Sequence, residues 1–146
     1  MPKSKIAGGN INICTFVQTD PAAPMNGCIQ CTGGNVPILG IAQEFTNQMA
    51  GTQGVTPALA ASKGQPIAIR DNAPGDIGMQ DVLLCVGSGY TVEPDNYLVS
   101  DASGNGIPLS ITSSRTTAQY VGAIAVEAGT PGSYIRVTSL DPGTMY

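Results

Sequence analysis

Histidine and tryptophan are missing from this 146-residue chain, and phenylalanine occurs only twice. Without histidine, the Ser-His-Asp and Cys-His systems of nucleophilic enzymes are excluded, and acid–base chemistry falls to carboxylates, lysine or tyrosine. The ten carboxylates are scattered along the chain. We therefore expect a protein that is not an enzyme and has no catalytic residues. With so few aromatic residues, its core must consist of Ile, Val, Leu, Ala and Met.

Charge is also scarce, because charged residues make up 11% of the chain and only six of them are Lys or Arg. Nucleic-acid binders need clustered cations, so a net charge of −4 predicts no nucleic-acid partner. No apolar segment follows Lys3 and Lys5, as a secretory signal requires, and no window approaches the roughly 18 apolar residues of a membrane span. We expect a soluble protein made in a cytoplasm, without a membrane partner.

The four cysteines are Cys14, Cys28, Cys31 and Cys85. A disulfide framework is not expected in a cytosolic product of this length. Cys28 and Cys31 have the C-x-x-C spacing, but zinc needs a second pair or histidines, and on a strand the two side chains would point to opposite faces. We interpret the cysteines as small buried hydrophobes, with a metal or redox role as the alternative. No metal and no cofactor are expected.

What the chain does contain is 19 glycines and 11 prolines, which separate short runs of branched and apolar residues. Such runs at close spacing predict an all-β fold, either a small β-barrel, a β-tulip or a sandwich. The expected strands are residues 11–17, 25–32, 36–43, 66–70, 81–86, 97–100, 107–112, 117–127 and 133–139.

Three local patterns add detail to this expectation. In residues 11–17, alternation places Ile11, Ile13, Thr15 and Val17 on one face. Residues 101–106 match the first half of a calcium loop, but the twelfth position is not glutamate, and a hairpin loop is the favoured interpretation. Residues 56–64 begin with a Thr-Pro pair and end in glycine, which predicts one short helix.

We divide the chain into a flexible N-terminal arm over residues 1–10, a single β domain over residues 11–140 and a C-terminal tail over residues 141–146. The arm is basic, contains glycine and has no strand pattern. Residues 44–55 form the longest segment inside the domain without a strand pattern. Long loops in compact domains are often functional, so we expect this one to make contacts.

The sequence resembles the small capsid cement or decoration proteins of tailed bacteriophages, which stabilise the head. The resemblance lies in residues 92–101 (VEPDNYLVSD), 122–128 (GAIAVEA) and 132–137 (GSYIRV), with residues 38–42 (ILGIA) as an earlier glycine-centred strand. It implies a β-barrel or β-tulip body, often trimeric, on the outer face of a phage head where major capsid subunits meet. The alternative is a β-sandwich adhesin or carbohydrate-binding module of a phage fibre or tail.

The expected partners are therefore the major capsid protein and other copies of this chain, as a homotrimer. The expected location is the outer surface of the virion, after synthesis in the host cytoplasm. The residues expected to contact the capsid come from the arm and from the 44–55 segment, and they are Lys3, Lys5, Ile6, Glu44, Phe45, Asn47, Gln48 and Met49.

Overall fold

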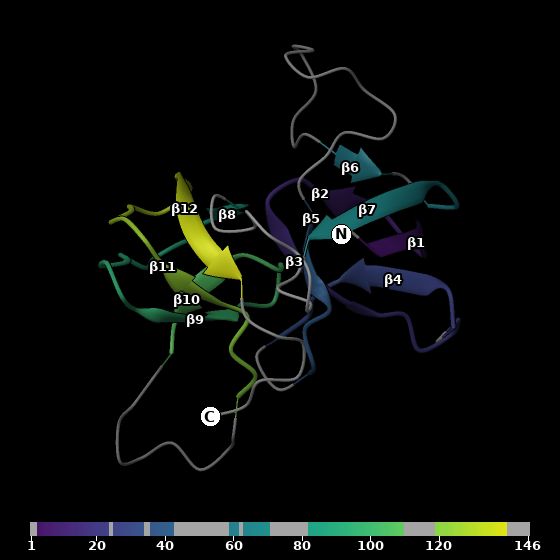
Figure 1. Cartoon of the computed structure of the whole chain (residues 1–146), viewed down its shortest axis with the longest axis horizontal. Helices are drawn as coiled ribbons and strands as arrows, with labels where there is room; N and C mark the ends of the chain where they lie inside the picture. Colours follow the sequence, from purple (N-terminus) through teal and green to yellow (C-terminus); the bar gives the residue numbers. More distant parts are fainter. Residues whose placement is uncertain are drawn as a thin grey trace.

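Two groups of short strands lie side by side, the earlier half of the chain in one and the later half in the other (Figure 1). The structure is a computed structural model, and it describes residues 3–23, 25–33, 36–42, 59–61, 63–70, 82–109 and 119–139. All regular structure in these ranges is β. The predicted all-β class is confirmed.

The strands are short, from two to six residues each. They are β1 Lys3–Ala7, β2 Ile11–Asn12, β3 Thr15–Thr19, β4 Gly27–Gln30, β5 Gly40–Ala42, β6 Leu59–Ala61, β7 Pro66–Arg70, β8 Val82–Cys85, β9 Tyr97–Ser100, β10 Gly106–Pro108, β11 Ala123–Ala125 and β12 Tyr134–Ser139.

Five strands form a closed barrel in the order β1-β4-β3-β5-β7, and β7 pairs back onto β1. The β1–β4 pair is parallel, and the other pairs of the barrel are antiparallel. Ala7, Ile11, Val17, Cys28, Ala42, Ile67 and Ile69 fill its interior, with Ile13 and Leu39 packed against them. The barrel thus has an apolar core of small, mostly branched side chains, as the composition predicts.

The second sheet has the order β10-β9-β11-β12-β8 and is antiparallel throughout. Its β9–β10 hairpin is shaped by Asp101, whose Oδ1 accepts the backbone N–H groups of Ser103 at 2.8 Å and Asn105 at 2.9 Å. The prediction of a hairpin loop over residues 101–106 is therefore confirmed.

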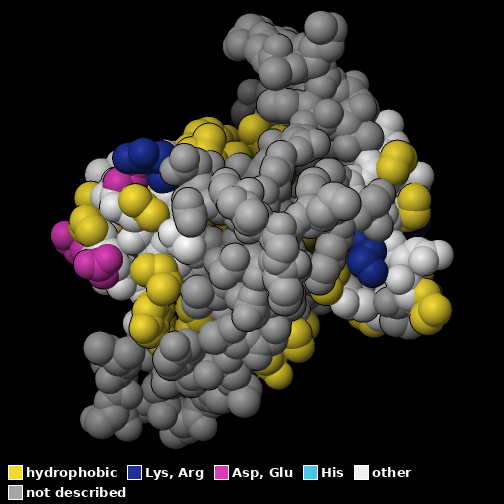
Figure 2. All heavy atoms as spheres, viewed as in Figure 1, with side chains coloured by type: hydrophobic (Ala, Val, Ile, Leu, Met, Phe, Trp, Pro, Cys, Tyr) yellow, Lys and Arg dark blue, Asp and Glu magenta, His cyan; other side chains and the backbone are white. Residues whose placement is uncertain are grey.

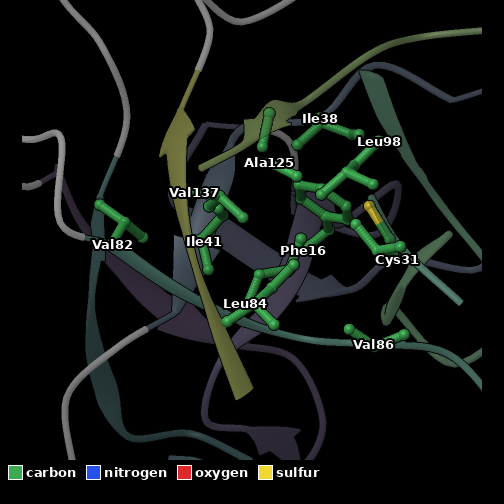
Figure 3. Packing of buried hydrophobic residues seen from close by; sticks show 13 residues of the cluster. Phe16, Cys31, Ile38, Ile41, Val82, Leu84, Val86, Leu98, Ala125 and Val137 are labelled. Atoms are coloured by element: carbon green, nitrogen blue, oxygen red, sulfur yellow. The ribbon is translucent and has the colours of Figure 1, made fainter. Parts of the chain in front are cut away.

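The wall formed by β3 and β5 is shared by two cores. Val17 and Ala42 point into the barrel, whereas their neighbours Phe16 and Ile41 belong to a second cluster with the other sheet. All four side chains are fully buried. Figure 3 shows Phe16 among Leu98, Ile38 and Cys31, with Leu84 and Val137 close by. The second sheet therefore packs on the outside of the barrel wall.

The helix predicted for residues 56–64 is wrong. Leu59–Ala61 is strand β6, which pairs antiparallel with β2, and Lys63 and Gly64 form a turn; residues 56–58 lie outside the described ranges. A helix of one or two turns has little stability of its own, so pairing with β2 overrides local propensity. Gly64 is left-handed, with φ of 88°, but it ends a β6–β7 turn instead of a helix.

The flexible arm predicted for residues 1–10 is corrected over Lys3–Ala7, which forms strand β1 of the barrel. Its backbone pairs with β7 on one side and β4 on the other. Among the β1 side chains that the structure describes, Lys5 to Ala7, only Ala7 is fully buried and Ile6 is exposed, so these residues carry little strand pattern. The boundaries of the single domain and the C-terminal tail remain predictions.

The strand predicted over residues 11–17 is interrupted at Cys14, which has a φ of 59° in the turn between β2 and β3. Ile11, Ile13 and Val17 still pack on the same barrel core, as the alternation predicts. The turn lets one short segment contribute two strands that pair with different partners, β6 and β4–β5.

Candidate interaction surface

Of the predicted contact residues of the N-terminal segment, Ile6 faces the outside of the barrel, whereas Lys5 lies opposite Ile67 on the alternate face of β1 and reaches Met25 through its Nζ. Ile6 is 44% exposed, between Pro66 on β7 and Gly27 on β4. The Lys5 Nζ donates a hydrogen bond of 3.2 Å to the backbone oxygen of Met25, whose side chain is 85% exposed. We call Lys5, Ile6, Met25 and Pro66 the β1 surface.

The backbone explains why Met25 lies beside β1. The Ile6 N–H donates to the Asn26 carbonyl at 2.8 Å, which fixes the turn before β4 against β1. In that turn, Asp20 Oδ1 accepts the Ala22 N–H at 2.9 Å. The sequence interpretation missed Met25, although a large apolar residue within a turn rich in Pro, Ala and Asn was a usable signal.

The other predicted contacts are not placed. The backbone of Lys3 belongs to β1, but its side chain is not described. Glu44, Phe45, Asn47, Gln48 and Met49 lie outside the described residues. The structure therefore brings together Lys5 and Ile6 of the predicted set, and it adds Met25 and Pro66.

Charge is unevenly divided between the two halves of the described chain. Around the barrel, the described charged side chains are Lys5, Lys63 and Asp20. The second sheet and its loops carry Glu93, Asp95, Asp101 and Glu127 against Arg136. Figure 2 shows the carboxylates gathered at the left, over the second sheet and with basic atoms near them, and a separate basic side chain at the right, over the barrel. The β1 surface is thus apolar with a basic rim.

A groove of about 320 Å³ lies at the opposite end of the molecule from the β1 surface. Its floor includes the bridge between Val92 and Gly129, and Tyr134, 53% exposed, lies along it. Glu127 accepts the Arg136 backbone N–H and its Nε–H, both at 3.1 Å, and these hydrogen bonds lower the pKa of Glu127. Residues far apart in sequence line this groove, and no local pattern indicated it.

The C-x-x-C cysteines lie in different cores, as strand geometry predicts. Cys28 is in the barrel interior and Cys31 is between the barrel and the second sheet. Burial raises the pKa of Cys28 to about 11 and of Cys31 to about 12. Neutral, buried thiols are poor nucleophiles and poor metal ligands. Across the described residues, no group of three or more potential metal ligands comes together.

The fold defines a small β domain, with a second sheet carried on the wall of its barrel. The structure is similar to that of the N base of head fiber gp8.5 from bacteriophage phi29, with a TM-score of 0.52 and 12% sequence identity. The similarity covers 95% of this chain and 92% of that chain. At this identity it shows a shared fold.

Sequence comparisons add nothing to this likeness, because no protein-family model matches the chain and no curated protein matches it. Within the described residues, none of the structure is a helix long and apolar enough to span a bilayer.

Proposed function

We propose that this chain is a structural protein of a phage virion that binds the outer surface of the head as a cement or decoration protein. The observation that carries the proposal is the end-to-end similarity of fold to the base of a phage head fiber. The sequence resemblance to cement proteins of tailed phages points to the same place. In this role the chain acts without catalysis, by bridging neighbouring subunits of the major capsid protein.

The β1 surface supplies the contact in this proposal. Exposed Ile6 and Met25 offer apolar area, and Lys5 offers a cation at its rim. Interfaces of this kind gain most of their affinity from a few buried apolar side chains surrounded by a polar rim. The barrel holds β1 on both sides, so the surface is preorganised and loses little entropy on binding.

Residues 44–55 are proposed as a second contact, to the shell or to a sister subunit. A homotrimer that engages several capsid subunits would multiply a weak contact through avidity. Sedimentation equilibrium of the purified chain tests the trimer, and a monomeric mass at all concentrations would contradict it.

The test uses shells assembled from the major capsid protein alone, mixed with purified protein and sedimented. We expect saturable binding by the wild type and at least about a tenfold loss of affinity for Ile6→Glu and Met25→Glu, because each places a charge in the contact. The matched control is Val126→Glu, since Val126, directly after β11 of the second sheet, is 45% exposed, against 44% for Ile6. Circular dichroism verifies that each variant is folded.

Two outcomes distinguish an error in the proposed capsid role from an error in the choice of the β1 surface. If the wild type does not bind shells, the capsid role is refuted. If Val126→Glu loses as much affinity as Ile6→Glu, the role stands and the β1 surface is the wrong contact. Electron cryomicroscopy of decorated shells then shows which lattice positions are occupied.

A carbohydrate-binding role is the second candidate, and one observation favours it. The groove beside exposed Tyr134 is lined by Thr91, Glu93 and Thr130, which combine an aromatic face with hydroxyl and carboxylate groups. On a glycan array, this role predicts binding that Tyr134→Ala removes. An array without hits leaves the cement role as the only candidate.

A further inference from the structure

Two cysteines meet where the barrel joins the second sheet. Cys14, in the turn between β2 and β3, donates its N–H to the Ala42 carbonyl of β5 at 2.5 Å. Its carbonyl accepts the N–H of Cys85, the last residue of β8, at 2.8 Å. Cys14 therefore bonds to both sheets, and its direct neighbour across the junction is another cysteine.

The backbone contact gives this pair the spacing of a disulfide. A single N–H···O bond of 2.8 Å keeps the Cα atoms of its two residues within about 7 Å of each other. A disulfide spans Cα separations of about 4.4–6.8 Å. None of the four cysteines, all within the described residues, is in a disulfide in this structure.

Tyr134 lies on the same face of the second sheet as the Cys85 side chain. It lies directly opposite Cys85 on β12, and its pKa is raised by burial and then by the charges of Cys85 and Cys14. The charge effect of Cys14 on this phenol, beside that of Cys85, supports the same placement of the two residues. Cys85 is only half-buried, which leaves a path for a small oxidant.

We propose that Cys14 and Cys85 form a reversible disulfide that ties the barrel to the second sheet under oxidising conditions. With oxidised glutathione, the Cys85 thiolate attacks one glutathione sulfur and releases one glutathione thiolate. The Cys14 thiolate then attacks the Cys85 sulfur of this mixed disulfide and releases the second. The two cysteine protons pass to the two released thiolates, so two cysteines are oxidised and one glutathione disulfide is reduced.

The bridge would stabilise the fold by restricting the unfolded chain. It closes the segment from residue 14 to residue 85, which includes most of the barrel. Closing so long a loop raises the melting temperature by roughly 10 °C in a domain of this size. Burial, with Asp101 adding its charge, raises the pKa of Cys85, so bridge formation accelerates as the pH rises.

The experiment treats the purified full chain with oxidised glutathione and maps its peptides by mass spectrometry without reduction. We expect a peptide pair joined through Cys14 and Cys85, two hydrogens lighter than the reduced pair, and a higher melting temperature that dithiothreitol reverses. Cys85→Ser should lose both effects. The matched control Cys31→Ala, in the neighbouring cluster, should keep the crosslink and the temperature shift.

Mapping of the wild type decides the proposal even if a variant folds poorly. A glutathione adduct that persists on Cys85 without a crosslink would overturn it. So would a bridge between Cys28 and Cys31, or four thiols that stay reduced. The test requires no capsid, so its result is independent of the function proposed above.

Discussion

Two glycines at the junction of the sheets lie where an added Cβ atom would clash with neighbouring atoms. A Cβ on Gly122 would lie 2.5 Å from Phe16 Cε1 and 2.9 Å from Ile38 Cδ1. Gly104 has a φ of 80°, and a Cβ there would lie 2.8 Å from Gln30 Cγ. The Phe16 N–H donates to the Gly104 carbonyl at 2.7 Å. The close approach of Gly104 to β3 therefore allows a hydrogen bond between the two sheets.

Gly122→Ala should lower the free energy of unfolding by about 1–3 kcal/mol, because the added methyl group overpacks the core around Phe16. Urea unfolding measures the change. The control is Gly9→Ala, where a Cβ meets nothing within 4 Å. Equal stability for the two variants would mean that the junction is looser than described.

The buried thiols predict a loss of stability at alkaline pH. The pKa of Cys28 rises from 9.0 to about 11 on folding, and that of Cys31 to about 12, so the fold favours the neutral thiol. This stability is complete below pH 9 and is lost as the pH rises through the folded values. At pH 10 the loss is roughly 1 kcal/mol for each thiol.

Urea unfolding at pH 7, 9 and 10 measures this loss. The double variant Cys28→Ala/Cys31→Ala lacks both thiols, so its stability should decline less between pH 7 and pH 10 than that of the wild type. This comparison holds whatever the stability of the variant at pH 7. A decline of the same size in both proteins would assign it to tyrosine or lysine instead.

At the scale of elements, strand β1 is held in the barrel by its backbone hydrogen bonds more than by the burial of its side chains. The Ile6 N–H donates to the Asn26 carbonyl, and the Ala7 N–H donates to the Gln65 carbonyl at 2.9 Å. Deleting residues 2–9 would remove a strand of the barrel, so loss of shell binding by that deletion would not identify a contact. Substitutions of exposed side chains on β1 are the sharper test.

Ile6→Pro should cost about 1–3 kcal/mol of stability, because proline lacks the N–H and leaves the Asn26 carbonyl without its partner. Ile6→Thr keeps the N–H at the same half-exposed position and should stay within about 0.5 kcal/mol of the wild type. Thermal unfolding compares the two. Similar losses for both would mean that the Ile6 side chain, and not the hydrogen bond, stabilises β1.

Strands were predictable where the side chains carry a burial pattern. The predicted ranges 66–70 and 97–100 coincide with β7 and β9. Of the three described side chains of β1, Lys5, Ile6 and Ala7, one is fully buried, and this gives little pattern to detect. The helix expected near residue 60 failed for the opposite reason, because its local signals were clear but pairing with β2 decides the structure.

The whole molecule unfolds as one unit if the two sheets depend on their common core. Phe16, on the barrel wall, is fully buried among side chains of the second sheet (Figure 3). Phe16→Ala should therefore cost about 3–5 kcal/mol and weaken both sheets. Hydrogen exchange measures this as equal loss of protection in β7 and β12. Loss confined to β12 would show that the barrel is stable alone.

The candidate surface was only partly predictable, because its residues are far apart in the sequence and are brought together by the fold. Lys5 and Ile6 were chosen as members of a basic arm, whereas they belong to a barrel strand. Met25 reaches the same surface through the Asn26–Ile6 hydrogen bond, and Pro66 through the β1–β7 register. Such long-range pairings leave no mark in a local sequence pattern.

The closed barrel has a consequence for any partner. Because β7 pairs back onto β1, each of these five strands has a paired neighbour on both sides within the ring. An incoming chain finds no edge strand there to extend, so recognition by strand addition is closed to it. A partner on this side must be recognised through the shapes and charges of the barrel's side chains. Single substitutions can therefore change which partner is bound.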